Sequence, residues 1–353
     1  MNMHIIKIRA ILLAGILFYN YQSVQAGNKD RTGQAGATEL LINPWARSSG
    51  IASAGVAAVR GIEAQAINVA GLAFTQKTEI VFARTAWLVG TGSNLNAFGL
   101  SQKIGSSSVL GLGFTSMGFG EIMRTNPDNP EGGLGTFSPR FLNINISYAK
   151  EFSNSIYGGI NLKVINQSIS NLSATGVAID AGVQYVTGKR KELKFGISLR
   201  NIGTPIKYSG DGLSSRATMP IGTSLTIEQR SARFELPSQL NIGGAYDIYF
   251  SKENTDHRIT AMANFQSNSF YRDIYQLGGE YAFKNMFMAR IGYNFESQMF
   301  SEVNRTNALT GFCAGATIEV PVNKKGSVMG IDYSFRASNP FSGSHAIGLR
   351  LGL

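Results

Sequence analysis

Side chains that commonly carry catalysis or bind metal ions are scarce in this sequence of 353 residues. It contains one cysteine, Cys313, and three histidines, His4, His257 and His345. No pair of them is placed to build a metal site, which needs several nitrogen or sulfur ligands. The G-x-S-x-G motif of a serine nucleophile is also absent. A serine, a histidine and an aspartate could still meet in a barrel wall, as in outer-membrane esterases, but we favour a protein that is not an enzyme and that needs no metal or cofactor.

Charged residues within otherwise uncharged segments are the other candidates for a polar site. They alternate with apolar residues, which predicts that they lie on the inner face of a barrel. One interpretation is a polar pathway through the lumen. The other, which we prefer, is that these charges pair with each other and with a segment that fills the lumen. The candidate lumen charges are Asp180, Arg200, Asp247, Arg290, Glu296, Asp332 and Arg350.

The segments that carry these charges alternate with a period of two residues, as in LKFGISLR at 193–200. Such alternation places one face of a strand in an apolar medium and the other in a polar one. A soluble sandwich or propeller also alternates, with its apolar face inward. Here many segments run about ten residues, the length of a transmembrane strand. Their polar faces carry Gly, Asn, Ser and Thr more often than Lys or Glu. The pattern therefore favours an all-β transmembrane barrel over a soluble sheet.

Fourteen such segments can be counted, an even number as in bacterial single-chain barrels. They are residues 78–88, 94–104, 107–119, 140–150, 155–168, 174–186, 193–203, 238–249, 257–267, 272–283, 285–296, 309–320, 326–336 and 344–353. If the N-terminus is periplasmic, the longest links are all external. These links are 120–139, 204–237, 297–308 and 337–343. Long external loops and short periplasmic turns are typical of outer-membrane barrels.

Composition agrees with this architecture. Charged residues make up 15% of the chain, glycine contributes 41 residues, and the mean hydropathy is −0.01. A helical membrane protein would need several apolar runs of about 20 residues, and the 10% aromatic content argues against disorder. The net charge of +10 is spread over short turns, so we expect contact with anionic outer-membrane lipid or lipopolysaccharide and none with nucleic acid.

The N-terminus differs from the rest of the chain. Residues 1–26 have a basic start, an apolar run and a small-residue end, and are interpreted as a secretory signal peptide, with an uncleaved anchor as the alternative. Residues 27–76 are rich in small uncharged residues and are expected to form a plug inside the barrel of residues 77–353. Export and a barrel together predict the outer membrane of a Gram-negative bacterium.

The long external links carry apolar residues that could form a partner-binding surface. Folding of these residues over the barrel mouth is an equally weighted alternative. Prolines and glycines in 120–139 are expected to keep that link from pairing as strands. The candidate partner-binding residues are Phe137, Tyr208, Met219, Ile221 and Phe234.

The plug segment resembles the start of the PorV/PorQ family, which is related to the FadL-type transporters. The likeness lies in INPWARSSG at 42–50, AGVA at 54–57 and INVAGLAF at 67–74, with Val69 in place of a usual proline. The residues that match the family pattern are Asn43, Pro44, Arg47, Gly50, Gly55, Asn68 and Gly71.

This resemblance implies a plugged fourteen-stranded barrel of the type IX secretion system, or of the linked gliding machinery, in Bacteroidetes. Its implied partners are a large translocon barrel and secreted cargo with a C-terminal signal domain, bound by the external loops. The alternative is a FadL-type passive transporter of hydrophobic small molecules. That alternative expects an apolar pocket above the plug and a lateral opening in the wall. The glycine pairs Gly158-Gly159 and Gly278-Gly279 are candidates for the opening, with ordinary strand glycines as the equal alternative.

Overall fold

The computed structural model describes residues 26–250, 256–323 and 326–353. The predicted signal peptide lies outside the described residues, apart from Ala26. No helix in the described ranges is long and apolar enough to cross a membrane.

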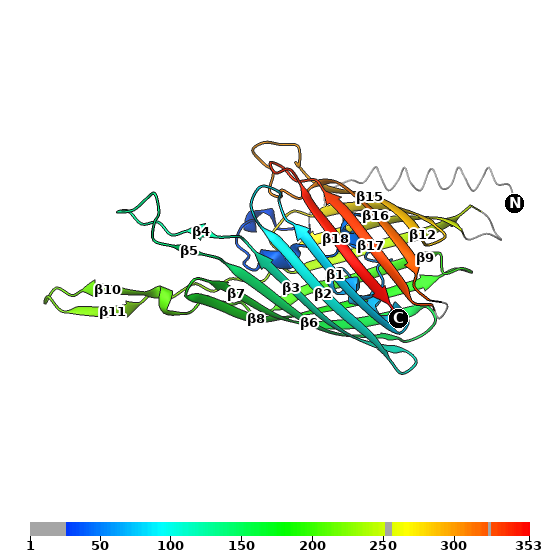
Figure 1. Cartoon of the computed structure of the whole chain (residues 1–353), viewed down its shortest axis with the longest axis horizontal. Coiled ribbons are helices and arrows are strands. Elements are labelled where there is room, and N and C mark those ends of the chain that lie inside the picture. The colour runs from blue at the N-terminus through cyan, green and yellow to red at the C-terminus, as the bar shows by residue number, and fades with distance from the viewer. Residues whose placement is uncertain (1–25, 251–255, 324–325) are drawn as a thin grey trace.

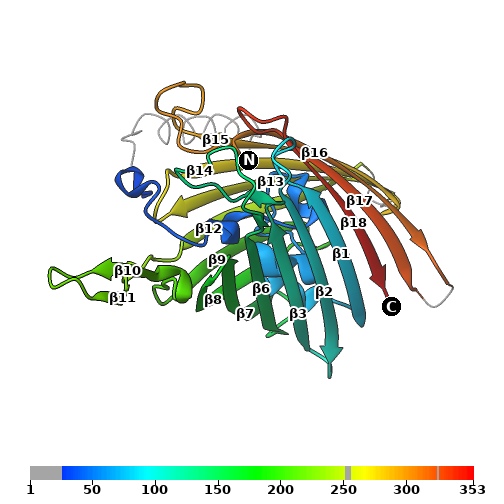
Figure 2. The same ribbon diagram turned by 60° about the vertical axis from the view of Figure 1, so that its left-hand side comes forward.

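Fourteen antiparallel strands close into a barrel in which the first strand, β1, pairs with the last, β18 (Figures 1 and 2). The barrel strands are β1 (Thr78–Ala86), β2 (Asn94–Ile104), β3 (Ser108–Gly118), β6 (Arg140–Glu151), β7 (Ile156–Ile169), β8 (Leu172–Thr187), β9 (Leu193–Gly203), β12 (Gln239–Tyr249), β13 (His257–Asn268), β14 (Ile274–Phe283), β15 (Phe287–Glu296), β16 (Gly311–Pro321), β17 (Val328–Arg336) and β18 (Ser344–Gly352). Each predicted segment corresponds to one of these strands, so the predicted fold class is confirmed.

The barrel is inside-out with respect to a soluble protein. Along β8, outward residues such as Val177, Ile179 and Val183 are exposed, whereas the inward Asp180 and Gln184 are buried. Apolar residues are exposed in the same way on the other barrel strands. An exposed apolar outer face and a polar interior distinguish a membrane barrel from a sandwich.

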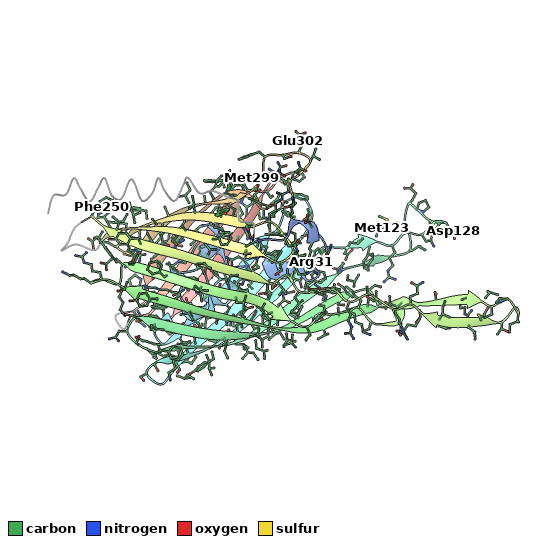
Figure 3. The ribbon with its side chains drawn as sticks, turned by 180° about the vertical axis from the view of Figure 1, so that it is seen from behind. Arg31, Met123, Asp128, Phe250, Met299 and Glu302 are labelled. Atoms are coloured by element: carbon green, nitrogen blue, oxygen red, sulfur yellow. The ribbon has the colours of Figure 1, made fainter. Side chains whose placement is uncertain are left out.

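The longest links gather at one end of the barrel, called here the long-loop end. Two small hairpins project from it: β4 (Ile122–Met123) with β5 (Thr136–Phe137), and β10 (Ser214–Thr218) with β11 (Ser224–Glu228), the latter preceded by the short helix η5 (Asp211–Leu213) (Figure 1). Figure 3 places Met123 and Asp128 beyond this end and Phe250 at the opposite, short-turn end.

The expectation that link 120–139 would not pair is wrong. Its prolines and glycines lie between the two short strands, where they form the turn. Ile122 and Met123 are therefore free to pair with Phe137 and Thr136.

The segment that fills the lumen consists of η2 (Thr38–Leu41), α2 (Ala46–Ser49), η3 (Ile62–Ala66) and η4 (Val69–Phe74). We call residues 38–76 the plug. Helix η4 contacts β6, β7 and β8, and α2 contacts β16 and β17 across the lumen. The residues before the plug lie at the long-loop end instead of in the lumen: in η1 (Lys29–Arg31), Arg31 stacks 4.1 Å from the Phe270 ring centre and pairs with Glu235 at 2.9 Å. Of the predicted segment 27–76, residues 38–76 are the ones that fill the lumen.

Candidate functional site: a filled lumen with two different mouths

Glycines line the barrel wall at many of the positions where it meets the plug. At eleven of them, a Cβ atom would come within 3.4 Å of a plug atom. They are Gly99, Gly111, Gly113, Gly159, Gly182, Gly196, Gly243, Gly278, Gly292, Gly315 and Gly348, on ten strands. We call this set the glycine belt. At Gly99, for example, a Cβ would lie 2.5 Å from Ile62 and 3.0 Å from Trp45. Wall and plug backbone approach more closely than any side chain would allow.

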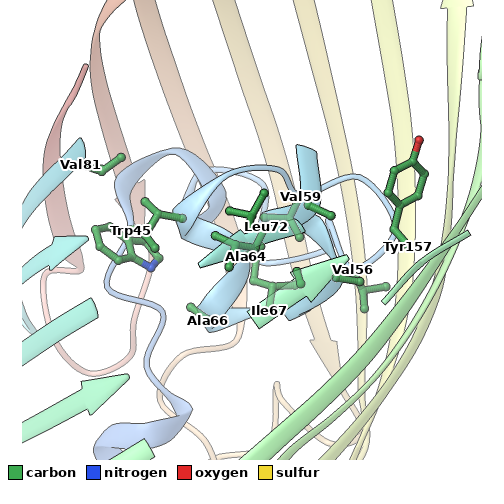
Figure 4. Close-up of a cluster of buried hydrophobic side chains, with 14 of the residues drawn as sticks. Trp45, Val56, Val59, Ala64, Ala66, Ile67, Leu72, Val81 and Tyr157 are labelled. Carbon is green, nitrogen blue, oxygen red and sulfur yellow. The ribbon is translucent and has the colours of Figure 1, made fainter. Parts of the chain in front are cut away.

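An apolar cluster holds the plug against one side of the barrel (Figure 4). Ile62 and Leu72 of the plug are completely buried, and Trp45 is 2% exposed. They pack with small wall residues that include Val81 of β1 and Val109 of β3. We call this side, formed by β1–β3 and β6–β8, the apolar wall.

Hydrogen bonds from inward-facing polar side chains satisfy the irregular backbone of the plug. Gln184 Nε2 donates to the Val56 carbonyl at 3.1 Å, and Ser198 Oγ donates to the Ile67 carbonyl at 2.8 Å. Asn68 Nδ2 donates to the carbonyls of Val56 at 2.9 Å and Val183 at 3.0 Å. Buried backbone groups need such partners, so these contacts fix the plug in one position.

Residues of the family-like motif serve mainly to shape the plug. Asn43 Oδ1 accepts from the Trp45 amide at 3.1 Å, and Asn68 Oδ1 accepts from the Ala70 amide at the start of η4. Gly50 lies directly against Gly315 of the wall, and Gly71 against the Val59 carbonyl. The remaining motif residues have other contacts. Pro44 lines a small cavity beside Trp45, and Gly55 lies against Ile51. Arg47 reaches toward Glu280 of β14.

The opposite side of the lumen carries most of the ion pairs, and we call it the charged wall. One further pair, Lys163 with Asp180, lies on β7 and β8 within the apolar wall. Lys194 of β9 pairs with Asp247 of β12 at 2.6 Å. Glu280 of β14 accepts Arg290 at 2.7 Å, Arg258 at 2.8 Å and, more distantly, the plug's Arg47 at 3.9 Å. Buried charges of this kind require partners.

The structure places all the candidate lumen charges in the barrel interior, although few of them pair with each other. Among them, Arg350 lies 3.8 Å from Asp332, but its closer partner is Glu319 at 2.8 Å. Asp180 pairs with Lys163 at 2.7 Å. Arg200 makes no ion pair within the described ranges; it donates to the Leu40 carbonyl of the plug and to Gln239. Glu296 is buried near the long-loop end, where Thr306 donates to it.

The partners that sequence reasoning missed are Lys163, Lys194, Glu280 and Glu319. Lys163, Lys194 and Glu319 occupy polar positions of alternating strands and could have been found from that signal. Glu280 follows Gly278-Gly279, where the alternation is interrupted.

At the long-loop end, Tyr208 and Phe234 do not form an exposed partner surface. Their rings lie 5.7 Å apart and pack over Leu40 of the plug and Ile165 of the wall. Tyr208 Oη donates to Gln167 at 2.6 Å, which in turn donates to Glu39 of the plug. The loop folds over the barrel mouth and leaves these two residues partly buried there, as the alternative expected, and their part in partner binding stays a prediction.

The remaining loop candidates are more accessible. Ile221 is 86% exposed and Met219 41% exposed, both at the turn of the β10–β11 hairpin. Phe137 is half-buried beneath the Arg124 guanidinium, 5.9 Å from the ring centre.

A second apolar cluster, the apolar rim, lies at the long-loop end where the plug meets β1–β3 and β6. Its buried members are Trp87, Leu95 and Met117; its partly exposed members are Ile42, Leu88, Phe119, Phe141 and Leu309. Phe119 and Phe141 meet edge to face, with ring centres 4.9 Å apart. The rim joins one plug residue to three external links.

The short-turn end has a cavity of a different kind. It has a volume of about 500 Å³ and lies between the plug and the charged wall, near Thr78, Asn285 and Leu353. Five arginines, two lysines and four glutamates line it. We call it the basic cavity.

The glycine pairs do not open the wall. Strand pairing continues without a register shift through Gly158-Gly159 and Gly278-Gly279 on both sides. One glycine of each pair faces the plug. A Cβ at Gly159 would touch the Val69 carbonyl, and a Cβ at Gly278 would touch the Ile51 carbonyl. A register shift does occur between β8 and β9, at Asp180. The expected lateral opening at the glycine pairs is therefore wrong.

Within the described ranges, no group of three or more His, Cys, Asp or Glu side chains is placed to hold a metal ion. Buried Cys313 is a free thiol.

No protein-family model matches the chain, and no curated protein matches its sequence. Solved structures match its fold. The Pseudomonas putida toluene transporter TodX aligns with a TM-score of 0.54 at 11% identity, covering 88% of this chain and 97% of TodX. A FadL homologue of Pseudomonas aeruginosa aligns with a TM-score of 0.51 at 11% identity, covering 88% of this chain and 96% of the homologue. The chain therefore has the fold of the FadL-type outer-membrane transporters, a plugged barrel of fourteen strands.

Proposed function

We propose that this protein passes small hydrophobic molecules across the outer membrane of a Gram-negative bacterium, entering at the long-loop end. The apolar rim carries this proposal. It offers partly exposed aromatic and aliphatic side chains at the mouth of the barrel, directly beside the plug. Concave apolar surfaces with a few polar groups are the usual binding sites for small ligands.

The fold likeness to a toluene transporter supports the same class of solute. Aromatic hydrocarbons are poorly soluble in water, and the paired rings of Phe119 and Phe141 offer the edge-on geometry that aromatic rings prefer. From the rim, apolar residues continue down the apolar wall between β1–β3 and the plug.

Uptake of radiolabelled toluene by cells that express the protein tests this proposal. The double variant Phe119→Ser with Phe141→Ser should reduce the initial rate severalfold, because it makes the entry surface polar. Ile221→Ser is the matched control, since it makes an exposed apolar residue polar at the tip of a hairpin away from the rim. Equal rates for the wild type and the double variant would contradict the proposal.

A second function, in type IX secretion or the linked gliding machinery, is favoured by the β10–β11 hairpin. The hairpin projects from the barrel (Figure 1), and its Ile221 and Met219 are exposed and lie outside the apolar cluster where the loop meets the plug. Apolar side chains at the tip of a projecting hairpin are suited to contact another protein. The resemblance of residues 42–74 to the PorV/PorQ family points to a translocon barrel and secreted cargo as the partners.

Pull-down from detergent-solubilised outer membrane of the native host tests this second function. Recovery of a large barrel or of secreted cargo, lost in Met219→Ser with Ile221→Ser and retained in the Phe119/Phe141 variant, would support it. Recovery of the protein alone, with co-purified hydrophobic solute, would contradict it.

A further inference from the structure

The basic cavity is separated from the apolar rim by the plug, so it has no part in the solute entry proposed above. Its lining contains seven cationic side chains and four anionic ones. Two aspartates outside the lining, Asp247 and Asp332, lie against its Lys194 and Arg350. With these counted, cationic and anionic side chains are nearly balanced, seven to six.

The carboxylates are unevenly shared among the cationic groups. One carboxylate, Glu280, serves three guanidinium groups, those of Arg290, Arg258 and Arg47. Two other lining carboxylates accept plug backbone amides instead: Glu63 accepts from Ser48 at 3.0 Å, and Glu79 from Ile62 at 2.8 Å. The cavity therefore holds more guanidinium donors than its own carboxylates satisfy.

Arg60 differs from the other four arginines of the cavity. It makes no ion pair with any residue in the described ranges, and its guanidinium lies 4.8 Å from the Phe74 ring centre. Arg60 is solvent-exposed and lines the cavity. Burial lowers the pKa of the Arg60 guanidinium, and an anion beside it would offset that effect.

We propose that the basic cavity binds a phosphate group presented from the short-turn, periplasmic side, with Arg60 as its main ligand and Arg258 and Arg47 beside it. Several guanidinium groups in one cavity favour a multiply charged anion over a single carboxylate, and arginine binds phosphate through paired hydrogen bonds. The volume of about 500 Å³ fits a small phosphate monoester. The headgroup of an anionic phospholipid offers the same chemistry.

Isothermal titration of the purified protein, in a neutral detergent, with glycerol 3-phosphate or with a short-chain phosphatidylglycerol tests this site. Saturable binding of either probe is expected, and the probe that binds identifies the source of the phosphate. Arg60→Gln should weaken binding by about tenfold or more, since it removes one charge-assisted hydrogen bond. Arg60→Lys should restore part of the affinity.

Arg216→Gln is the control, because Arg216 is an exposed arginine on the β10–β11 hairpin and its loss changes the net charge equally. It should bind as the wild type does. Retained thermal stability of Arg60→Gln shows that the variant is folded. Absence of binding by the wild type, equal affinity in Arg60→Gln, or an equal loss in Arg216→Gln would each overturn the proposal. None of these results depends on solute uptake at the rim.

Discussion

The plug meets two walls that are built by different means. Against the apolar wall, Ile62 and Leu72 are completely buried among small aliphatic residues. Against the charged wall, Lys194, Asp247 and Glu280 pair across neighbouring strands beside a cavity of about 500 Å³. The same plug is thus packed tightly on one side and leaves a polar space on the other.

The difference shows what each wall contributes. Burial of apolar surface stabilises the plug in its place. A buried ion pair contributes little net stability, because desolvation offsets the attraction. We infer that the apolar wall holds the plug and that the charged wall leaves a polar space beside it.

Breaking an ion pair of the charged wall should have the largest effect. Lys194→Met leaves Asp247 as an unpaired buried charge and should lower the free energy of unfolding by about 3–5 kcal/mol. Adding Asp247→Leu should recover most of that loss, since an apolar pair can replace a buried ion pair. Urea unfolding in lipid vesicles measures both. A double variant as unstable as the single one would show that the charged wall holds the plug after all.

Truncating a buried side chain at the apolar wall should lower the free energy of unfolding by nearly as much. Leu72→Ala opens a cavity beneath the plug and should lower the free energy of unfolding by about 3 kcal/mol. Leu110→Ala on the lipid-facing side of β3 is the control, because Leu110 is 45% exposed and its loss leaves no cavity. Similar unfolding curves for the two variants would refute tight packing at this wall.

Replacing one glycine of the belt by a larger residue should have a smaller effect on stability. Gly99→Leu forces the side chain against Ile62 and Trp45 and should destabilise the protein by about 1–3 kcal/mol. Gly279→Leu faces outward, where its nearest neighbour is Ile291 at 3.7 Å, and should be tolerated. Conductance in planar bilayers adds a second readout, because a displaced plug should open the lumen in Gly99→Leu alone.

The smallest expected effect concerns Glu39, which is buried where the plug meets the long-loop mouth. Burial raises the pKa of this carboxyl above its usual 4.5, and the hydrogen bonds from Gln167 only partly oppose the shift. The protonated form is therefore favoured in the folded state. Its contribution to stability is complete below pH 4.5 and is lost as the pH rises through the raised value.

Glu39→Gln should remove this pH dependence and stabilise the protein by about 1 kcal/mol at pH values above the raised pKa, because the amide carries no charge to bury. Thermal unfolding between pH 4 and pH 8 measures it. A steeper pH dependence in Glu39→Gln would contradict the assignment.

Strand positions could be predicted from the sequence because a membrane barrel imposes strict alternation over about ten residues. The lumen charges were found in the same way, whereas their partners were harder to assign: Asp180 pairs with Lys163 on the neighbouring strand, and no sequence pattern gives the register that brings them together.

Loops and glycines were less predictable. Tyr208, Phe234 and Ile221 are all large apolar residues in the same external link. Only the fold shows that Tyr208 and Phe234 cover the barrel mouth while Ile221 is exposed on the projecting hairpin. Excess glycine was visible, yet the belt depends on how the plug sits, which is a tertiary property. The rim likewise joins Ile42, Trp87 and Leu309 from distant parts of the chain.

The most direct test of the proposed function is the initial rate of toluene uptake by cells that express equal amounts of wild type, Phe119→Ser/Phe141→Ser and Ile221→Ser in the outer membrane. We expect a severalfold loss of uptake for the rim variant and none for the hairpin variant. Equal uptake by all three, or a loss confined to Ile221→Ser, would contradict it.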